Sequence, residues 1–200
     1  KYQELLLDLF VFLLMLSLPI AIFTYILSDE LVYLFAGEDF LSASLALKIT
    51  SGLIVVSTVT NFTGVQILYS NKLDTKVAES LGVGAFVCIV MNLMFIPIYQ
   101  HNGAAIAALS AEFSIMLYQF FVIYKKDLSF AFMLNLRFFK LCGACAIYFI
   151  LTLICYELTG QLSLLARFTV LTLFSLIVYP SILVLIKDRL LINIYHKLIK

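Results

Sequence analysis

Two ionisable side chains, Lys48 and Glu112, lie inside long apolar segments of the sequence. Lys48 comes seven residues after the segment start at Leu41, and Glu112 comes eight residues after the start at Ala104. At a helical rise of about 1.5 Å per residue, each is expected roughly 10–12 Å from the start of its segment. Opposite charges at matched depth in a membrane indicate an ion pair or a shared aqueous cavity, because an isolated charge is costly there.

These two residue types suit transport chemistry. A carboxylate such as Glu112 can couple transport to a proton or a sodium ion, and an ammonium such as Lys48 can attract an anionic substrate. Two structural alternatives stay open. The long stem of Lys48 can carry its charge to the outer membrane surface, and the hydroxyls of Ser110 or Ser114 can cap Glu112 locally.

Uncharged polar residues also lie deep in the apolar segments, where such side chains commonly form hydrogen bonds between helices. We predict that two of them, Asn61 and Gln66, bind substrate together with Lys48. The polar residues of this kind are Asn61, Gln66, Asn92 and Gln119.

Enzymatic chemistry has no support in the sequence. We find no hydrolase triad, no nucleotide-binding loop and no metal-ligand spacing, and no connection is long enough to house a catalytic site. Cys142 and Cys145 have a C-x-x-C spacing inside an apolar segment, where we expect them to pack as small residues. We therefore predict no catalytic residue, no metal and no cofactor. Close helix approach is predicted at Gly82, Gly84 and Gly103.

The composition is that of an integral membrane protein. Of the 200 residues, 64% are hydrophobic and only 12% are charged, with a mean hydropathy of +1.09. A soluble domain usually carries about twice that charge. The chain enters an apolar run almost at once after Lys1, so we expect it to be a piece of a longer chain that lacks an N-terminal portion.

A scan for apolar stretches of about 20 residues predicts six transmembrane helices and no strands. Pro19 is expected to bend the first helix, and an acidic loop is expected at 28–40. The tail at 187–200 has apolar residues at helical spacing beside Lys and Arg, which predicts an amphipathic helix on the membrane surface. The six spans are about 9–27, 41–69, 77–98, 104–124, 141–158 and 162–186.

The basic residues predict the orientation. With alternating connections, one side of the membrane carries only Arg167, and Lys48 lies within a span. Because Lys and Arg accumulate in cytoplasmic loops, both ends of the chain are expected in the cytoplasm and the acidic loop outside. The side predicted to be cytoplasmic carries Lys1, Lys72, Lys76, Lys125, Lys126, Arg137, Lys140, Lys187, Arg189, Lys197 and Lys200.

The order of several short motifs resembles the C-terminal half of Wzx-type polysaccharide flippases, in the multidrug/oligosaccharidyl-lipid/polysaccharide exporter superfamily. The part with the strongest similarity is 92–126, with its N-L-x-x-I-P…G-A-A-I-A…E pattern. The motifs that carry the resemblance are Leu18-Pro19-Ile20, Leu34-Phe35-Ala36-Gly37-Glu38-Asp39-Phe40, Gln66-Ile67-Leu68, Asn92-Leu93, Ile96-Pro97 and Gly103-Ala104-Ala105-Ile106-Ala107 before Glu112.

The resemblance implies a fragment of a fourteen-helix fold, in which two six-helix lobes enclose a central cavity and two further helices follow. Residues 1–126 would then form the last four helices of the second lobe, and 127–200 the two additional helices with the amphipathic tail. It also implies a function. Family members move undecaprenyl-diphosphate-linked oligosaccharide across the bacterial inner membrane by alternating access, with no nucleic-acid partner.

Two other interpretations remain open at this stage. One is a cation-coupled multidrug exporter of the same superfamily, whose cavity would favour aromatic and acidic groups over basic ones. The other is a membrane scaffold without transport activity, in which Lys48 and Glu112 form only an interhelical ion pair.

Overall fold

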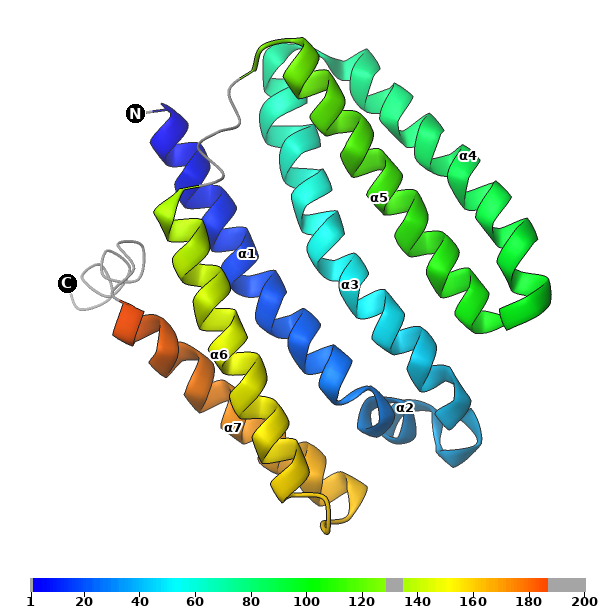
Figure 1. Ribbon diagram of the computed structural model, residues 1–200, viewed down its shortest axis with the longest axis vertical. Helices are drawn as coiled ribbons and strands as arrows, with labels where there is room; N and C mark the ends of the chain where they lie inside the picture. Colours follow the sequence, from blue (N-terminus) through cyan, green and yellow to red (C-terminus); the bar gives the residue numbers. More distant parts are fainter. Residues whose placement is uncertain (1, 129–134, 187–200) are drawn as a thin grey trace.

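The computed structural model describes residues 2–128 and 135–186, which form an all-α structure (Figure 1). Six helical segments in this part are long and apolar enough to cross a membrane, so the chain is a multi-pass membrane protein as predicted. The predicted tail helix at 187–200 lies outside the described residues. The α-helices are α1 (Tyr2–Ile26), α2 (Ser28–Ala36), α3 (Ser44–Asn61), α4 (Asp74–Tyr99), α5 (His101–Lys125), α6 (Leu136–Leu158) and α7 (Leu164–Ile186).

The helices lie side by side in the order α4, α5, α3 and α1, with α6 and α7 packed beyond α1 (Figure 1). α1 lies at the centre of this row, and its side chains form much of the largest apolar cluster. Phe10, for example, is almost fully buried and its ring contacts Phe62 at a centroid distance of 4.9 Å. α1 continues as a helix through Pro19. It therefore joins the α3–α5–α4 group to the α6–α7 pair.

Most of the described lysines and arginines lie at one of the two ends of the helix bundle, where carboxylates such as Asp8 and Glu79 accompany them. The start of α1, the α5 end and the start of α6 lie together, while α2 and the α6–α7 turn lie at the opposite end (Figure 1). We call the first the basic end, because Lys72, Lys76, Lys125, Lys126, Arg137 and Lys140 lie there. We call the second the acidic end, because it contains Asp29, Glu30, Glu38 and Asp39.

The acidic segment at 28–40 is not the loop that the sequence predicts. It forms α2 and the first half of a 3₁₀ helix, η1 (Glu38–Ala43), which are separated by Gly37 with a φ of 90°. Its first turn is packed against the bundle, where Ser28 and Glu30 are almost fully buried. The segment therefore caps the acidic end of the bundle.

The second span is irregular at both ends. η1 precedes α3, and a π-helical stretch, η2 (Phe62–Leu68), and a short 3₁₀ turn, η3 (Tyr69–Asn71), follow it. Lys72 then turns the chain into α4 with a φ of 57°. A π-helical stretch rotates the side chains that follow it relative to those before it. The predicted span 41–69 therefore contains 3₁₀, α-helical and π-helical segments and is not one regular α-helix.

The turn between α4 and α5 is tight. Only Gln100, with a φ of 50°, separates the two helices. Gly103 makes this possible, since a Cβ there would lie 2.3 Å from the carbonyl oxygen of Phe95. Gly84 also confirms the predicted close approach, because its Cβ would meet Ile115 at 2.4 Å. Gly82 does not, as nothing lies within 4 Å of its Cβ position.

Gly103→Ala tests this geometry. We expect the added methyl group to lower the free energy of unfolding by about 1–3 kcal/mol, because it collides with main-chain atoms that cannot move without opening the α4–α5 turn. The measurement is thermal unfolding of the protein in detergent. Gly82→Ala is the matched control and should be neutral or slightly stabilising. Equal midpoints for the two variants would contradict the close approach at Gly103.

Candidate functional site

Lys48 lies close to the acidic end of the bundle. It is four residues after the start of α3, which is about 6 Å along the helix axis. Its ammonium nitrogen lies 3.4 Å from a carboxylate oxygen of Asp29 in α2, and both side chains are about one-third exposed. Lys48 is therefore paired with the cap helix, and the predicted pair with Glu112 does not form.

The register of α3 against α5 fixes the depth of both charged residues. The two helices run parallel, and Gly52 contacts Leu109 while the hydroxyl of Thr63 donates to the side-chain oxygen of Gln119. Residues about 57 apart in the sequence therefore lie side by side along this interface.

This register places Glu112 beside Val55 of α3, seven residues or about 10 Å further from the acidic end than Lys48. The prediction of matched depth was wrong. The error came from assuming that the two segments begin at the same depth, whereas the observed register offsets α3 along its axis relative to α5.

Glu112 is half-buried and points between two neighbouring helices. On the same helix, Leu109 contacts α3 at Gly52, and Ile115 is the close neighbour of Gly84 in α4. At about 100° per residue, Glu112 lies roughly 60° from each of them around the helix. Its carboxylate is thus directed at the seam where α5 meets both α3 and α4.

No described residue forms a hydrogen bond or an ion pair with Glu112. The neighbouring hydroxyls are occupied elsewhere: Ser110 donates to the carbonyl of Ile106 at 2.8 Å, and Ser114 donates to the carbonyl of Ala111 at 2.6 Å. The local cap expected from these serines is therefore not formed. A carboxylate inside a membrane span is costly when no described residue supplies a counter-charge, which makes Glu112 the candidate functional residue of this seam.

Asn61 and Gln66 are not brought together with Glu112. Asn61 lies about 180° around α3 from Gly52, is exposed, and donates its amide hydrogen to the carbonyl of Ser57 at 2.8 Å. Gln66 is half-buried in η2. The substrate-binding roles of these two residues stay predictions.

A polar cluster joins three helices about two turns from Glu112 toward the basic end. Gln119 of α5 is 2% exposed, accepts a hydrogen bond from Thr63 of η2, and donates to the hydroxyl of Ser80 of α4 at 3.3 Å. The predicted interhelical role is confirmed for Gln119, whereas Asn92 donates to the carbonyl of Cys88 in its own helix. The sequence analysis did not identify Thr63 and Ser80 as members of this cluster. Each is a small hydroxyl residue close in sequence to a glycine that allows tight helix packing, and that pattern could have predicted their roles.

Two ion pairs hold the α6–α7 pair against the rest, and neither was predicted. At the acidic end Arg167 of α7 lies 3.1 Å from Glu30, whose side chain is 1% exposed. The guanidinium also stacks on the ring of Tyr156 at 4.9 Å. At the basic end Arg137 of α6 lies 2.5 Å from Asp8 of α1. The sequence places these partners more than 100 residues apart, so only the tertiary structure identifies them.

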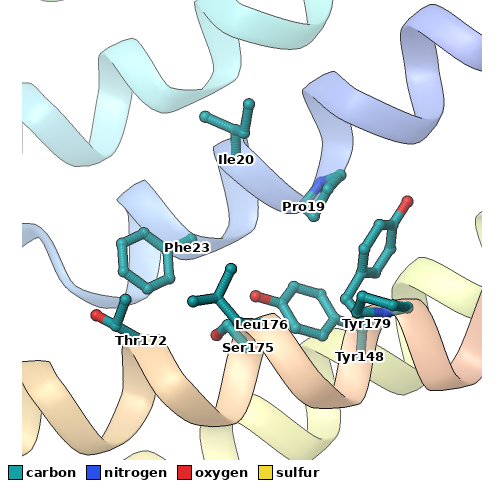
Figure 2. A pocket seen from close by; sticks show the side chains of 9 residues that line it. Pro19, Ile20, Phe23, Tyr148, Thr172, Ser175, Leu176 and Tyr179 are labelled. Carbon is teal, nitrogen blue, oxygen red and sulfur yellow. The ribbon is translucent and has the colours of Figure 1, made fainter.

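Between these ion pairs lies an apolar cavity of about 310 Å³ (Figure 2). It separates α1 from α7 and is bordered by Tyr148 of α6. Ile20 and Leu176 line it and are more than half exposed, so it opens to the side of the bundle. Its lining suits an apolar chain. The lining residues are Pro19, Ile20, Phe23, Tyr148, Thr172, Ser175, Leu176, Tyr179 and Pro180.

Metal binding finds no support within residues 2–128 and 135–186, where no group of three His, Cys, Asp or Glu side chains is close enough to hold an ion. The four cysteines are free, with Cys145 buried in the core and Cys142 exposed. No protein-family model, curated protein sequence or solved structure matches the chain.

The two acidic-end ion pairs should differ sharply in their effect on stability. Arg167→Met leaves the buried carboxylate of Glu30 without a counter-ion, and we expect a loss of about 3–5 kcal/mol in the free energy of unfolding. Lys48→Met breaks a partly exposed pair and should cost at most about 1 kcal/mol. Denaturant titration in micelles measures both.

A second variant separates charge from packing. Combining Glu30→Gln with Arg167→Met removes both charges and should restore most of the stability that Arg167→Met alone removes. If the double variant is as unstable as the single one, the loss comes from the packing of Arg167 on Tyr156 and not from the ion pair.

Proposed function

We propose that this chain is the C-terminal part of a flippase that moves undecaprenyl-diphosphate-linked oligosaccharide across the bacterial inner membrane by alternating access. The observation that carries the proposal is Glu112, a half-buried carboxylate at a three-helix seam with no counter-charge among the described residues. Such a group is expensive in a membrane and is typically retained where a substrate, proton or cation passes. The order of sequence motifs around Glu112 supports the family assignment.

Lys48 and Glu112 have separate tasks in this mechanism. Glu112 binds the coupling proton or sodium ion within the seam. Lys48, which is one-third exposed and 3.4 Å from Asp29, exchanges that carboxylate for the phosphate or acidic sugar of the substrate near the acidic end. The exchange is easy because a partly exposed ion pair contributes little to stability.

The apolar cavity beside α1 supports a lipid-linked substrate. The undecaprenyl chain is a long hydrocarbon, and the cavity is apolar and open to the side where membrane lipid would lie. The α6–α7 pair therefore provides a place for the lipid tail outside the polar path. In this proposal residues 1–126 belong to the second lobe of the transporter and residues 127–200 to the additional pair.

The charge distribution supports the orientation. The described lysines and arginines of the basic end fit a cytoplasmic surface, and α2 with η1 then faces outward. Both ends of the chain are cytoplasmic in this arrangement.

A cation-coupled multidrug exporter is the second candidate, and one observation favours it. Lys48 is paired with Asp29, so the unpaired charge deep within the described spans, that of Glu112, is acidic, as expected for a site that takes cationic drugs. The scaffold interpretation loses its main argument, because it required Lys48 and Glu112 to pair with each other.

Deletion of the intact gene in its host tests the proposal. We expect loss of surface polysaccharide, restored by the wild-type gene. Glu112→Gln, which keeps the shape and removes the charge, should lower transport about tenfold or more, since a lost interaction of about 1.4 kcal/mol changes an equilibrium tenfold. Glu157→Gln is the matched control, because Glu157 is an exposed carboxylate near the end of α6. Membrane insertion of each variant is verified by immunoblot.

The outcomes separate the candidates. Unchanged surface polysaccharide after deletion, in a host without a redundant transporter, would overturn the flippase proposal. Increased sensitivity to cationic drugs in the same strain would assign the chain to the exporters. Lost polysaccharide with a fully active Glu112→Gln variant would keep the function and remove Glu112 from the mechanism.

A further inference from the structure

A second cavity, of about 320 Å³, lies at the basic end between the start of α4 and the end of α5. It is distinct from the seam at Glu112 and from the apolar cavity beside α1. Lys76 is in the first turn of α4, and Lys125 is the last residue of α5, so the cavity lies where these two helices reach the membrane surface. Its lining residues are Lys76, Tyr118, Phe121, Val122, Lys125 and Lys126.

One side of this cavity is held by a fixed polar network. The ammonium of Lys76 lies 2.7 Å from the carboxylate of Glu79, one turn along the same helix. The hydroxyl of Tyr118 in α5 donates to that carboxylate as well. Glu79 therefore orders Lys76 and Tyr118 across the α4–α5 interface and compensates one positive charge.

The other two lysines have no such partner among the described residues. Lys125 and Lys126 are exposed, and the ammonium of Lys125 lies 5.9 Å from the centre of the Phe121 ring. The three ammonium groups that line the cavity and the carboxylate of Glu79 together carry two excess positive charges. Asp74 and Asp127 are close to these lysines in the sequence but do not line the cavity. An excess of this kind attracts an anion.

The remaining lining indicates how such an anion is presented. Phe121 is exposed on the outer surface of α5, and Val122 is buried next to it. This apolar wall continues from the lysines toward the middle of the span. A cation cluster at the membrane surface above an apolar wall matches an anionic headgroup joined to acyl chains.

We propose that this cavity binds an anionic phosphate group, with Lys125 and Lys126 as its principal cations and Lys76 as a third that Glu79 holds in place. The group belongs to a phospholipid headgroup or to a phosphate ester in solution, which share this chemistry. The site does not depend on the flippase proposal, since it uses none of the same residues.

Thermal unfolding of the detergent-solubilised protein with added phosphatidylglycerol tests the site. Phosphatidylcholine, whose headgroup has no net charge, and inorganic phosphate are the parallel additions. We expect phosphatidylglycerol to raise the unfolding midpoint and phosphatidylcholine to leave it unchanged. A double variant, Lys125→Gln with Lys126→Gln, should weaken the apparent Kd about 30-fold, because each lysine near an anionic group contributes on the order of fivefold.

A charge-matched control distinguishes a site from a general electrostatic effect. Lys72→Gln with Lys140→Gln removes the same charge from the same end of the bundle, at positions that do not line the cavity. This control should bind phosphatidylglycerol as the wild type does. Equal weakening in both double variants, or no effect of phosphatidylglycerol on the wild type, would overturn the proposal. Equal stabilisation by inorganic phosphate would assign the bound group to the soluble source.

Glu79→Gln gives a test of opposite sign. Removing the carboxylate releases Lys76 and raises the local excess of charge, so phosphatidylglycerol should bind about fivefold more tightly. A purely structural role of the Lys76–Glu79–Tyr118 network predicts only a lower midpoint without lipid. Unchanged or weaker lipid binding in this variant would contradict the role given to Lys76.

Discussion

The ion pair between Glu30 and Arg167 is the contact on which the arrangement of the α6–α7 pair depends. A carboxylate that is 1% exposed must be compensated, so α2 and α7 cannot separate at the acidic end without a large penalty. The pair of Asp8 with Arg137 acts at the opposite end of the same helices. Between the two, the hydroxyl of Tyr179 donates to the carbonyl of Met15 at 2.5 Å. These three polar contacts hold α7 and α6 against α1 while leaving the apolar cavity between them.

Glu112 contrasts with these compensated charges. The other charges of the described spans that face a neighbouring helix are paired near a membrane surface, where water and long side chains lower the cost. Glu112 is further inside, and the seam around it offers the polar cluster at Gln119 about 10 Å away but no cation within the described residues. A packing role would be served better by an apolar residue. This position of Glu112 is the physical basis of the transport proposal.

Close packing between α4 and α5 also positions the polar residues at the basic end. Gly84 and Gly103 let α4 approach α5 so closely that a methyl group would collide with its neighbours. That approach brings Glu79 within reach of Tyr118 and so organises the cavity at the basic end. In a membrane, where lipid and side chains are equally apolar, such close contacts and buried hydrogen bonds supply much of the association energy.

The sequence by itself determined the number of membrane spans and the separation of charge between the two ends, because hydropathy and the cost of burying a charge act locally along the chain. It also marked Glu112 and Gln119 as residues that need an explanation. Only the tertiary structure decided the partners. Lys48 pairs with Asp29 because residues 28–43 fold into a cap. Arg167 meets Glu30 because α7 returns beside α2, and neither pairing follows from spacing, since each joins segments whose register is set by packing between helices.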